Sequence, residues 1–131
     1  MQQVLLFATS QGQARPLTID DLGRLVLARP DLQVVAAQFA LDQTNTQLIA
    51  APASGHRLRL HDILTSTGSA GTVRFYAGSQ LLFGLNLAAN GGWSFNSVAG
   101  VPLEAAANLN VTSTCGSGPL YITVVYSVEE A

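Results

Sequence analysis

The fold class is decided by the stretch Leu120-Tyr121-Ile122-Thr123-Val124-Val125-Tyr126-Ser127-Val128. Its even-numbered residues are all aliphatic or aromatic, and polar side chains occur only between them. Successive side chains of a strand point to opposite faces of a sheet, so a period of two predicts a half-buried strand. The residues expected to face a core are Leu120, Ile122, Val124, Tyr126 and Val128.

The same alternation occurs in three earlier segments, 72–77, 80–87 and 108–113. Their expected core-facing residues are Val73, Phe75 and Ala77, then Leu81, Phe83, Leu85 and Leu87, and then Leu109, Val111 and Ser113. Short connections rich in Gly, Ser, Asn and Pro separate these segments, as in all-β domains. The sequence therefore predicts a jelly-roll-like antiparallel β-sandwich.

The chain is expected to divide into an N-terminal arm with a β-hairpin, residues 1–30, and a sandwich body, residues 31–131. The hairpin spans Pro16 to Leu27, with Gly23 supplying the positive φ of its turn. Residues 31–41 fit either a short amphipathic helix or a strand, and the sequence leaves both open.

Composition limits what the protein does. The chain has 131 residues, of which 48% are hydrophobic and only 11% charged, against about 25% in ordinary soluble domains. A formal net charge of −2 argues against a nucleic-acid partner. No segment has the roughly 20 apolar residues of a membrane helix, and the first residues lack the features of a signal peptide. We therefore expect no membrane partner and a soluble chain that is not exported.

The sequence predicts no catalytic residues, no cofactor and no metal site. A metal needs several converging ligands, whereas His56 and His61 are expected on opposite faces of one strand and Cys115 is the single cysteine. There is no nucleophile elbow, and the glycine-rich turns match no phosphate-binding loop. A hydrolase would need a cleft that brings together His61 or two carboxylates.

Four groups of residues are candidates for contact with another chain. An exposed apolar strand is expected at Val4, Leu5, Leu6 and Phe7. If their two strands pair as a hairpin, Arg57, Arg59 and Arg74 line one face that an acidic partner would complement; alternatively, the face is solvated and Asp62 or Glu104 pairs with the arginines. Tyr76 and Tyr121 are expected on outward faces. Trp93 follows a glycine-rich turn, where it is a sugar-stacking platform, an interface anchor or a core residue.

The chain also resembles small β-sandwich proteins of tailed-phage virions, particularly head decoration or cement proteins and tail-tip modules of jelly-roll type. The segments that carry the resemblance are 56–64, the 72–87 hairpin, Ala89-Asn90-Gly91-Gly92-Trp93, Val101-Pro102-Leu103, the closing strands 109–113 and 120–127, and the early Pro16-Leu17-Thr18-Ile19-Asp20 with Gly23-Arg24-Leu25.

This resemblance implies a non-catalytic structural protein on the capsid surface of a virion, made in the host cytoplasm. It implies a homotrimer that binds the major capsid protein and stabilises the head, with the N-terminal arm reaching a neighbouring subunit or the capsid. The resemblance maps no binding residue. The alternative is a carbohydrate-binding or receptor-binding jelly roll of a phage tail, with Trp93 or Tyr76 exposed to a glycan.

Overall fold

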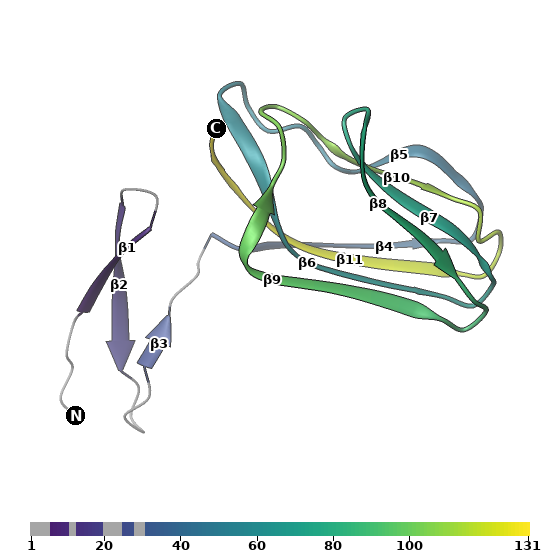
Figure 1. The fold of residues 1–131 in the computed structure, drawn as a ribbon, viewed down its shortest axis with the longest axis horizontal. Helices are drawn as coiled ribbons and strands as arrows, with labels where there is room; N and C mark the ends of the chain where they lie inside the picture. The colour runs from purple at the N-terminus through teal and green to yellow at the C-terminus, as the bar shows by residue number, and fades with distance from the viewer. Residues whose placement is uncertain (1–5, 11–12, 20–24, 28–30) are drawn as a thin grey trace. The chain divides into compact units, whose positions relative to one another are not determined.

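The computed structural model describes residues 6–10, 13–19, 25–27 and 31–131, with side chains from residue 31 onward (Figure 1). The chain forms two compact units, Met1–Asp31 and Leu32–Ala131. Val4, Leu5 and Gly23 lie outside the described residues.

The N-terminal unit contains a three-stranded antiparallel sheet in the order β1-β2-β3. Its strands are β1 (Leu6–Ser10), β2 (Gln13–Ile19) and β3 (Leu25–Leu27). The predicted hairpin is confirmed, because Ile19 pairs with Leu25 and Leu17 with Leu27. The strand predicted at the start of the chain is not isolated, since Leu6 and Phe7 pair with β2.

The second unit is a sandwich of two four-stranded antiparallel sheets, with orders β4-β11-β6-β9 and β5-β10-β7-β8 (Figure 1). Its strands are β4 (Gln33–Phe39), β5 (Gln43–Ile49), β6 (His56–Thr67), β7 (Gly71–Ala77), β8 (Gln80–Leu87), β9 (Gly92–Pro102), β10 (Leu109–Ser113) and β11 (Leu120–Glu130). The first four strands pair with the last four in reverse order, as in a long hairpin folded over into two sheets. This is the jelly-roll arrangement. The predicted all-β sandwich is confirmed, and the segment left open at 31–41 is a strand.

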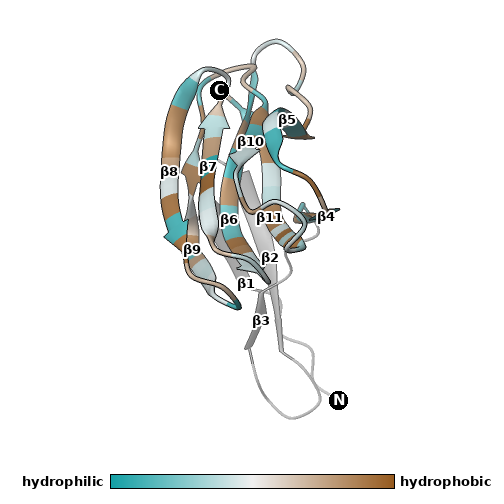
Figure 2. Ribbon diagram, turned by 90° about the vertical axis from the view of Figure 1, so that its right-hand side faces the viewer, coloured by the Kyte–Doolittle hydropathy of each residue, from teal (hydrophilic) through white to brown (hydrophobic). Residues whose placement is uncertain are grey.

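The core lies between the two sheets and is supplied by the alternating residues of the central strands. Val73, Phe75, Leu109, Val111 and Val124 are fully buried. Figure 2 shows the corresponding bands of high and low hydropathy along the strands. Burial of such side chains stabilises a fold by about 1.5–3 kcal/mol each. One expected core position is wrong: Val128 is 40% exposed near the end of β11.

A β-bulge overturns a second expected core position. Phe75 pairs with Phe83, but the neighbouring Tyr76 pairs with Leu81, so Leu82 is an extra residue in β8. One extra residue reverses the alternation of faces. Leu81 consequently lies opposite Tyr76 on the outer face of the sheet and is 52% exposed, whereas Phe83, Leu85 and Leu87 pack against the core as predicted.

Candidate functional site

One outer face of the sandwich is markedly apolar. It belongs to the sheet β4-β11-β6-β9, where Val34 is 65%, Leu64 56% and Tyr121 47% exposed. The registers set its residues in three rows across the sheet. We call this surface the apolar face; its rows are Val34-Val125-Asp62-Asn96, Ala36-Thr123-Leu64-Ser94 and Gln38-Tyr121-Ser66-Gly92.

The outer face of the other sheet is polar. It carries Gln47, Asn110, Thr112, Arg74 and Asn86 from four neighbouring strands, and we call it the polar face. Its side chains bond to one another: Asn108 Nδ2 donates to Gln47 Oε1 at 3.3 Å, and the hydroxyls of Thr72 and Thr114 are 2.9 Å apart. Removing water from the polar face should therefore cost more free energy than removing it from the apolar face.

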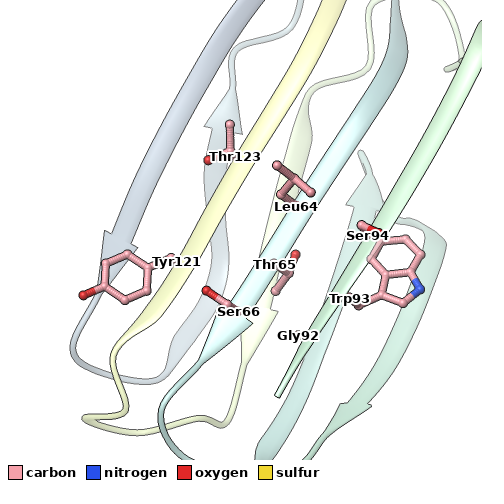
Figure 3. Close-up of a pocket in the computed structure, with 8 residues that line it drawn as sticks. All are labelled: Leu64, Thr65, Ser66, Gly92, Trp93, Ser94, Tyr121 and Thr123. Carbon is pink, nitrogen blue, oxygen red and sulfur yellow. The ribbon is translucent and has the colours of Figure 1, made fainter. Parts of the chain in front are cut away.

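A shallow groove of about 370 Å³ lies on the apolar face (Figure 3). Gly92 lies opposite Ser66 in its register, and a Cβ at Gly92 would be 2.9 Å from the backbone oxygen of Thr65. The groove thus needs glycine at this position. Its lining combines an aromatic ring with several hydroxyls: Leu64, Thr65, Ser66, Gly92, Trp93, Ser94, Tyr121 and Thr123.

Trp93 packs with the core rather than standing free. Its ring centroid is 5.4 Å from that of Phe83 and 6.2 Å from that of Phe95, and all three rings pack against the buried cluster. The sequence left open whether Trp93 is a stacking platform, an interface anchor or a core residue, and this geometry favours the core. Tyr121, which was expected on an outward face, is the exposed aromatic ring of the groove.

The three arginines do not share one face, which corrects the hairpin expectation. β6 and β7 belong to different sheets, so Arg74 lies on the polar face, away from Arg57 and Arg59. The partner of the latter two is Glu129, and not Asp62 or Glu104.

Glu129 is held by both guanidinium groups. Arg57 donates to its Oε2 from Nε at 3.1 Å and from Nη2 at 2.9 Å, and Arg59 Nη2 donates to the same oxygen at 3.1 Å. Arg59 Nε also donates to Glu129 Oε1, while its Nη1 donates to the carbonyl of Ala99 at 3.0 Å. The bond with Glu129 raises the pKa of Arg59, although burial opposes the shift. The cluster is an internal ion network rather than a free basic patch.

His61 lies in a second bulge and contacts a serine. Leu60 pairs with Tyr126 and Asp62 with Val125, so His61 is the extra residue of β6. Its Nε2 is 3.0 Å from Ser127 Oγ. A hydroxyl beside an imidazole is a first requirement for nucleophilic catalysis. However, His61 and Ser127 are only 5% and 4% exposed, and neither lines the groove, so the contact serves the fold.

Three other residues that the sequence analysis considered, Tyr76, Cys115 and His56, lie outside the groove and the ion network. Tyr76 lies half-buried on the polar face and Cys115 is buried. Within residues 31–131, His56 Nδ1 is 3.3 Å from the carbonyl of Ser54. No group of three metal-ligating side chains occurs among the described residues. Of Leu6 and Phe7, only the place in β1 is described.

Sequence reasoning missed most of the apolar face. Val34, Ala36, Leu64 and Ser66 were not selected, because a single strand does not reveal which of its faces lies on the core. A usable signal was present in β6: Ile63, Thr65 and Thr67 alternate with Leu64 and Ser66, and the former three are buried.

Comparisons with known proteins identify no family. No family model and no curated protein matches the chain. Two crystal structures of the capsular polysaccharide assembling protein CapF from Staphylococcus aureus, one of them described as CapF with the inhibitor 3-isopropenyl-tropolone, align with 12% identity and TM-scores of 0.31 and 0.30. Each alignment covers 98% of this chain, which spans 31% of the CapF chain. Within the described part of the chain, no helix is long and apolar enough to cross a membrane.

Proposed function

We propose that this chain is a non-catalytic structural protein of a virion, a capsid decoration protein that binds the major capsid protein as a homotrimer and stabilises the head. The jelly-roll sandwich is the fold that the sequence resemblance implies. The distinct N-terminal unit supports the idea of an arm that reaches a neighbouring subunit.

The observation that carries the proposal is the difference between the two outer faces. Val34, Leu64 and Tyr121 leave large apolar surface in water on one side, whereas on the other side Leu81 is the exposed large apolar side chain and its surroundings include amides, hydroxyls and Arg74. Contiguous exposed apolar surface with a polar rim is typical of protein interaction sites. The apolar face is therefore the surface proposed to meet the capsid.

The arrangement of ionisable groups supports a structural role. Glu129 is bound by two arginines, Asp62 accepts a hydrogen bond from Asn96 at 2.5 Å, and Asp42 accepts one from the backbone of Gly116 at 2.7 Å. Each of these carboxylates is bound to another group of the chain. A catalytic acid or base would instead face a substrate cleft.

The proposal is tested by native mass and by binding to particles. Light scattering across a dilution series gives the number of copies, and co-sedimentation with capsids assembled without the protein gives the affinity. We expect a threefold-symmetric assembly that saturates the capsid surface, because weak contacts held on one oligomer add to a tight attachment. A monomer that does not sediment with capsids overturns the proposal.

A second candidate function, glycan binding, is favoured by the groove itself. Tyr121 offers a ring for stacking, and Ser66, Ser94 and Thr123 provide hydroxyls around it. Sugar recognition combines such an apolar platform with polar groups. Titration of the protein with soluble glycans distinguishes the two functions, with binding detected by tryptophan fluorescence and calorimetry. Saturable glycan binding that Tyr121→Ala abolishes would favour this candidate.

A further inference from the structure

The sandwich has four edge strands, and β4 differs from the others. Its pairing with β11 continues without a register shift from Gln33 to Phe39. The strand Gln-Val-Val-Ala-Ala-Gln-Phe contains no charge, glycine or proline. An edge of this kind presents an unbroken row of backbone donors and acceptors, which natural sheets usually interrupt.

The other three edges are interrupted. β5 has register shifts against β10 and a positive φ of 46° at Asn45. β8 contains the extra residue Leu82 and a glycine at position 84, and β9 has a register shift and ends at Pro102. Bulges and prolines at edges hinder pairing with other strands. Within residues 31–131, β4 is thus the edge best suited to accept another strand.

The core is also incompletely covered along β4. Val35, Ala37 and Phe39 are its inward residues and remain only half-buried. On the neighbouring strand, Leu120, Ile122 and Val124 are at most 1% exposed. The side of the sandwich at β8 and β9 is closed by the rings of Phe83, Trp93 and Phe95. A further strand beside β4 would close the opposite side.

We propose that β4 pairs antiparallel with β4 of a second copy of this chain, around a twofold axis at Ala36. In this register Val35 lies opposite the second copy's Ala37, and Val34 opposite the second copy's Gln38, so inward residues meet inward residues. Small side chains at the axis and the lack of charge let the two strands approach. The sheets join into one of eight strands, and the two apolar faces become continuous.

This inference goes beyond the proposed function, since the contact needs no capsid. A twofold contact added to a threefold one joins trimers in pairs. The continuous face also doubles the number of docking surfaces in one assembly, which strengthens attachment to a repeating surface.

The test uses opposite charges at the axis in the full chain. A residue at a twofold axis faces its own copy, so Ala36→Lys and Ala36→Glu each place two like charges together. Ala36 is exposed and tolerates a polar side chain. We expect each variant to lose about half of the wild-type native mass in light scattering at low salt, and an equimolar mixture of the two to recover it.

A matched control is Ser94→Lys, which places the same charge in the same row of the sheet but at the opposite edge. Its mass should equal that of the wild type. A second variant avoids Ala36: Val34→Asp combined with Gln38→Lys creates attractive pairs across the axis and should shift dissociation to lower protein concentration.

Several outcomes overturn the inference: an odd number of copies in the wild type, a mass unchanged by Ala36→Lys, no recovery in the mixture, or no shift in the double variant. Melting temperatures close to that of the wild type establish that the variants fold. Loss of capsid binding with an intact twofold dimer would count against the proposed function alone, so the two failures are distinguishable.

Discussion

Arg57 lies directly opposite Glu129 in the register of β6 and β11, and its Nη2 is 2.9 Å from Glu129 Oε2. The next outward residue of β6, Arg59, binds the same carboxylate. Two of the six Lys and Arg residues in the chain therefore form an ion network that links the ends of two central strands. One carboxylate within the chain thus binds both guanidinium groups.

Replacement of Glu129 should destabilise the sandwich. Glu129→Gln leaves two partly buried guanidinium groups without their carboxylate, and the Arg59 side chain is only 17% exposed. Removing one partner of a fully buried ion pair lowers the free energy of unfolding by about 3–5 kcal/mol, and removing one partner of an exposed pair lowers it by less than about 1 kcal/mol. For this partly buried network we expect a loss of about 1–3 kcal/mol. Urea denaturation measures it.

The neighbouring acid is the control. Glu130 is exposed, and Glu130→Gln should change the free energy of unfolding by less than about 0.5 kcal/mol. Because the hydrogen bond with Glu129 raises the pKa of Arg59, the stability that this guanidinium gains is fully present below the pKa of a free arginine side chain and is lost only as the pH rises through the raised value. Equal stabilities of Glu129→Gln and Glu130→Gln would show that the network does not hold the strands.

The strands of the body were predictable because their residues alternate. Val73, Phe75, Leu109 and Val111 face the core as their period of two indicates. The alternation fails where a bulge adds a residue, at Leu82 and at His61, because a bulge depends on pairing with a distant strand. The face of Leu81 therefore could not be read from its own segment.

The carboxylate that binds Arg57 and Arg59 could not be predicted from the sequence for a related reason. Glu129 is 72 residues away from Arg57 in the chain, and only the jelly-roll topology sets β11 beside β6. The sequence suggested that strands consecutive in the chain pair as a hairpin, whereas the connection after Thr67 crosses to the other sheet. Faces made by three or four strands, such as the apolar face, need the strand order before they can be predicted.

Gly100 allows the end of β9 to approach β6. Its φ is +78°, and a Cβ there would lie 2.5 Å from Arg59 Cγ and 3.0 Å from His61 Cε1. Gly100→Ala should therefore lower the free energy of unfolding by about 1–3 kcal/mol, through strain and displacement of Arg59. Gly84→Ala is the control, since no atom lies within 4 Å of a Cβ at that position. Similar melting curves for both variants would contradict the close approach.

Trp93 and Tyr121 should separate stability from binding. Trp93→Ala removes a ring that packs on Phe83 and Phe95, and it should cost about 3 kcal/mol of unfolding free energy. Tyr121→Ala removes a ring that is 47% exposed, so it should lower the free energy of unfolding by less than about 1 kcal/mol. The same change should weaken the binding of any partner that occupies the groove. Thermal unfolding and partner binding are measured on the same samples. If Trp93→Ala melts like the wild type but no longer binds, Trp93 is an interface anchor and not a core residue.

The two outer faces can be compared with one pair of leucines. Leu64 on the apolar face is 56% exposed and Leu81 on the polar face is 52% exposed, so a lysine at either position perturbs folding to a similar, small extent. If the apolar face docks onto a capsid, Leu64→Lys places a charge inside the interface. We expect about tenfold or greater loss of affinity in co-sedimentation, which corresponds to about 1.4 kcal/mol. Leu81→Lys should bind like the wild type. Equal losses in the two variants would mean that docking does not use the apolar face, and a loss confined to Leu81→Lys would assign docking to the polar face instead.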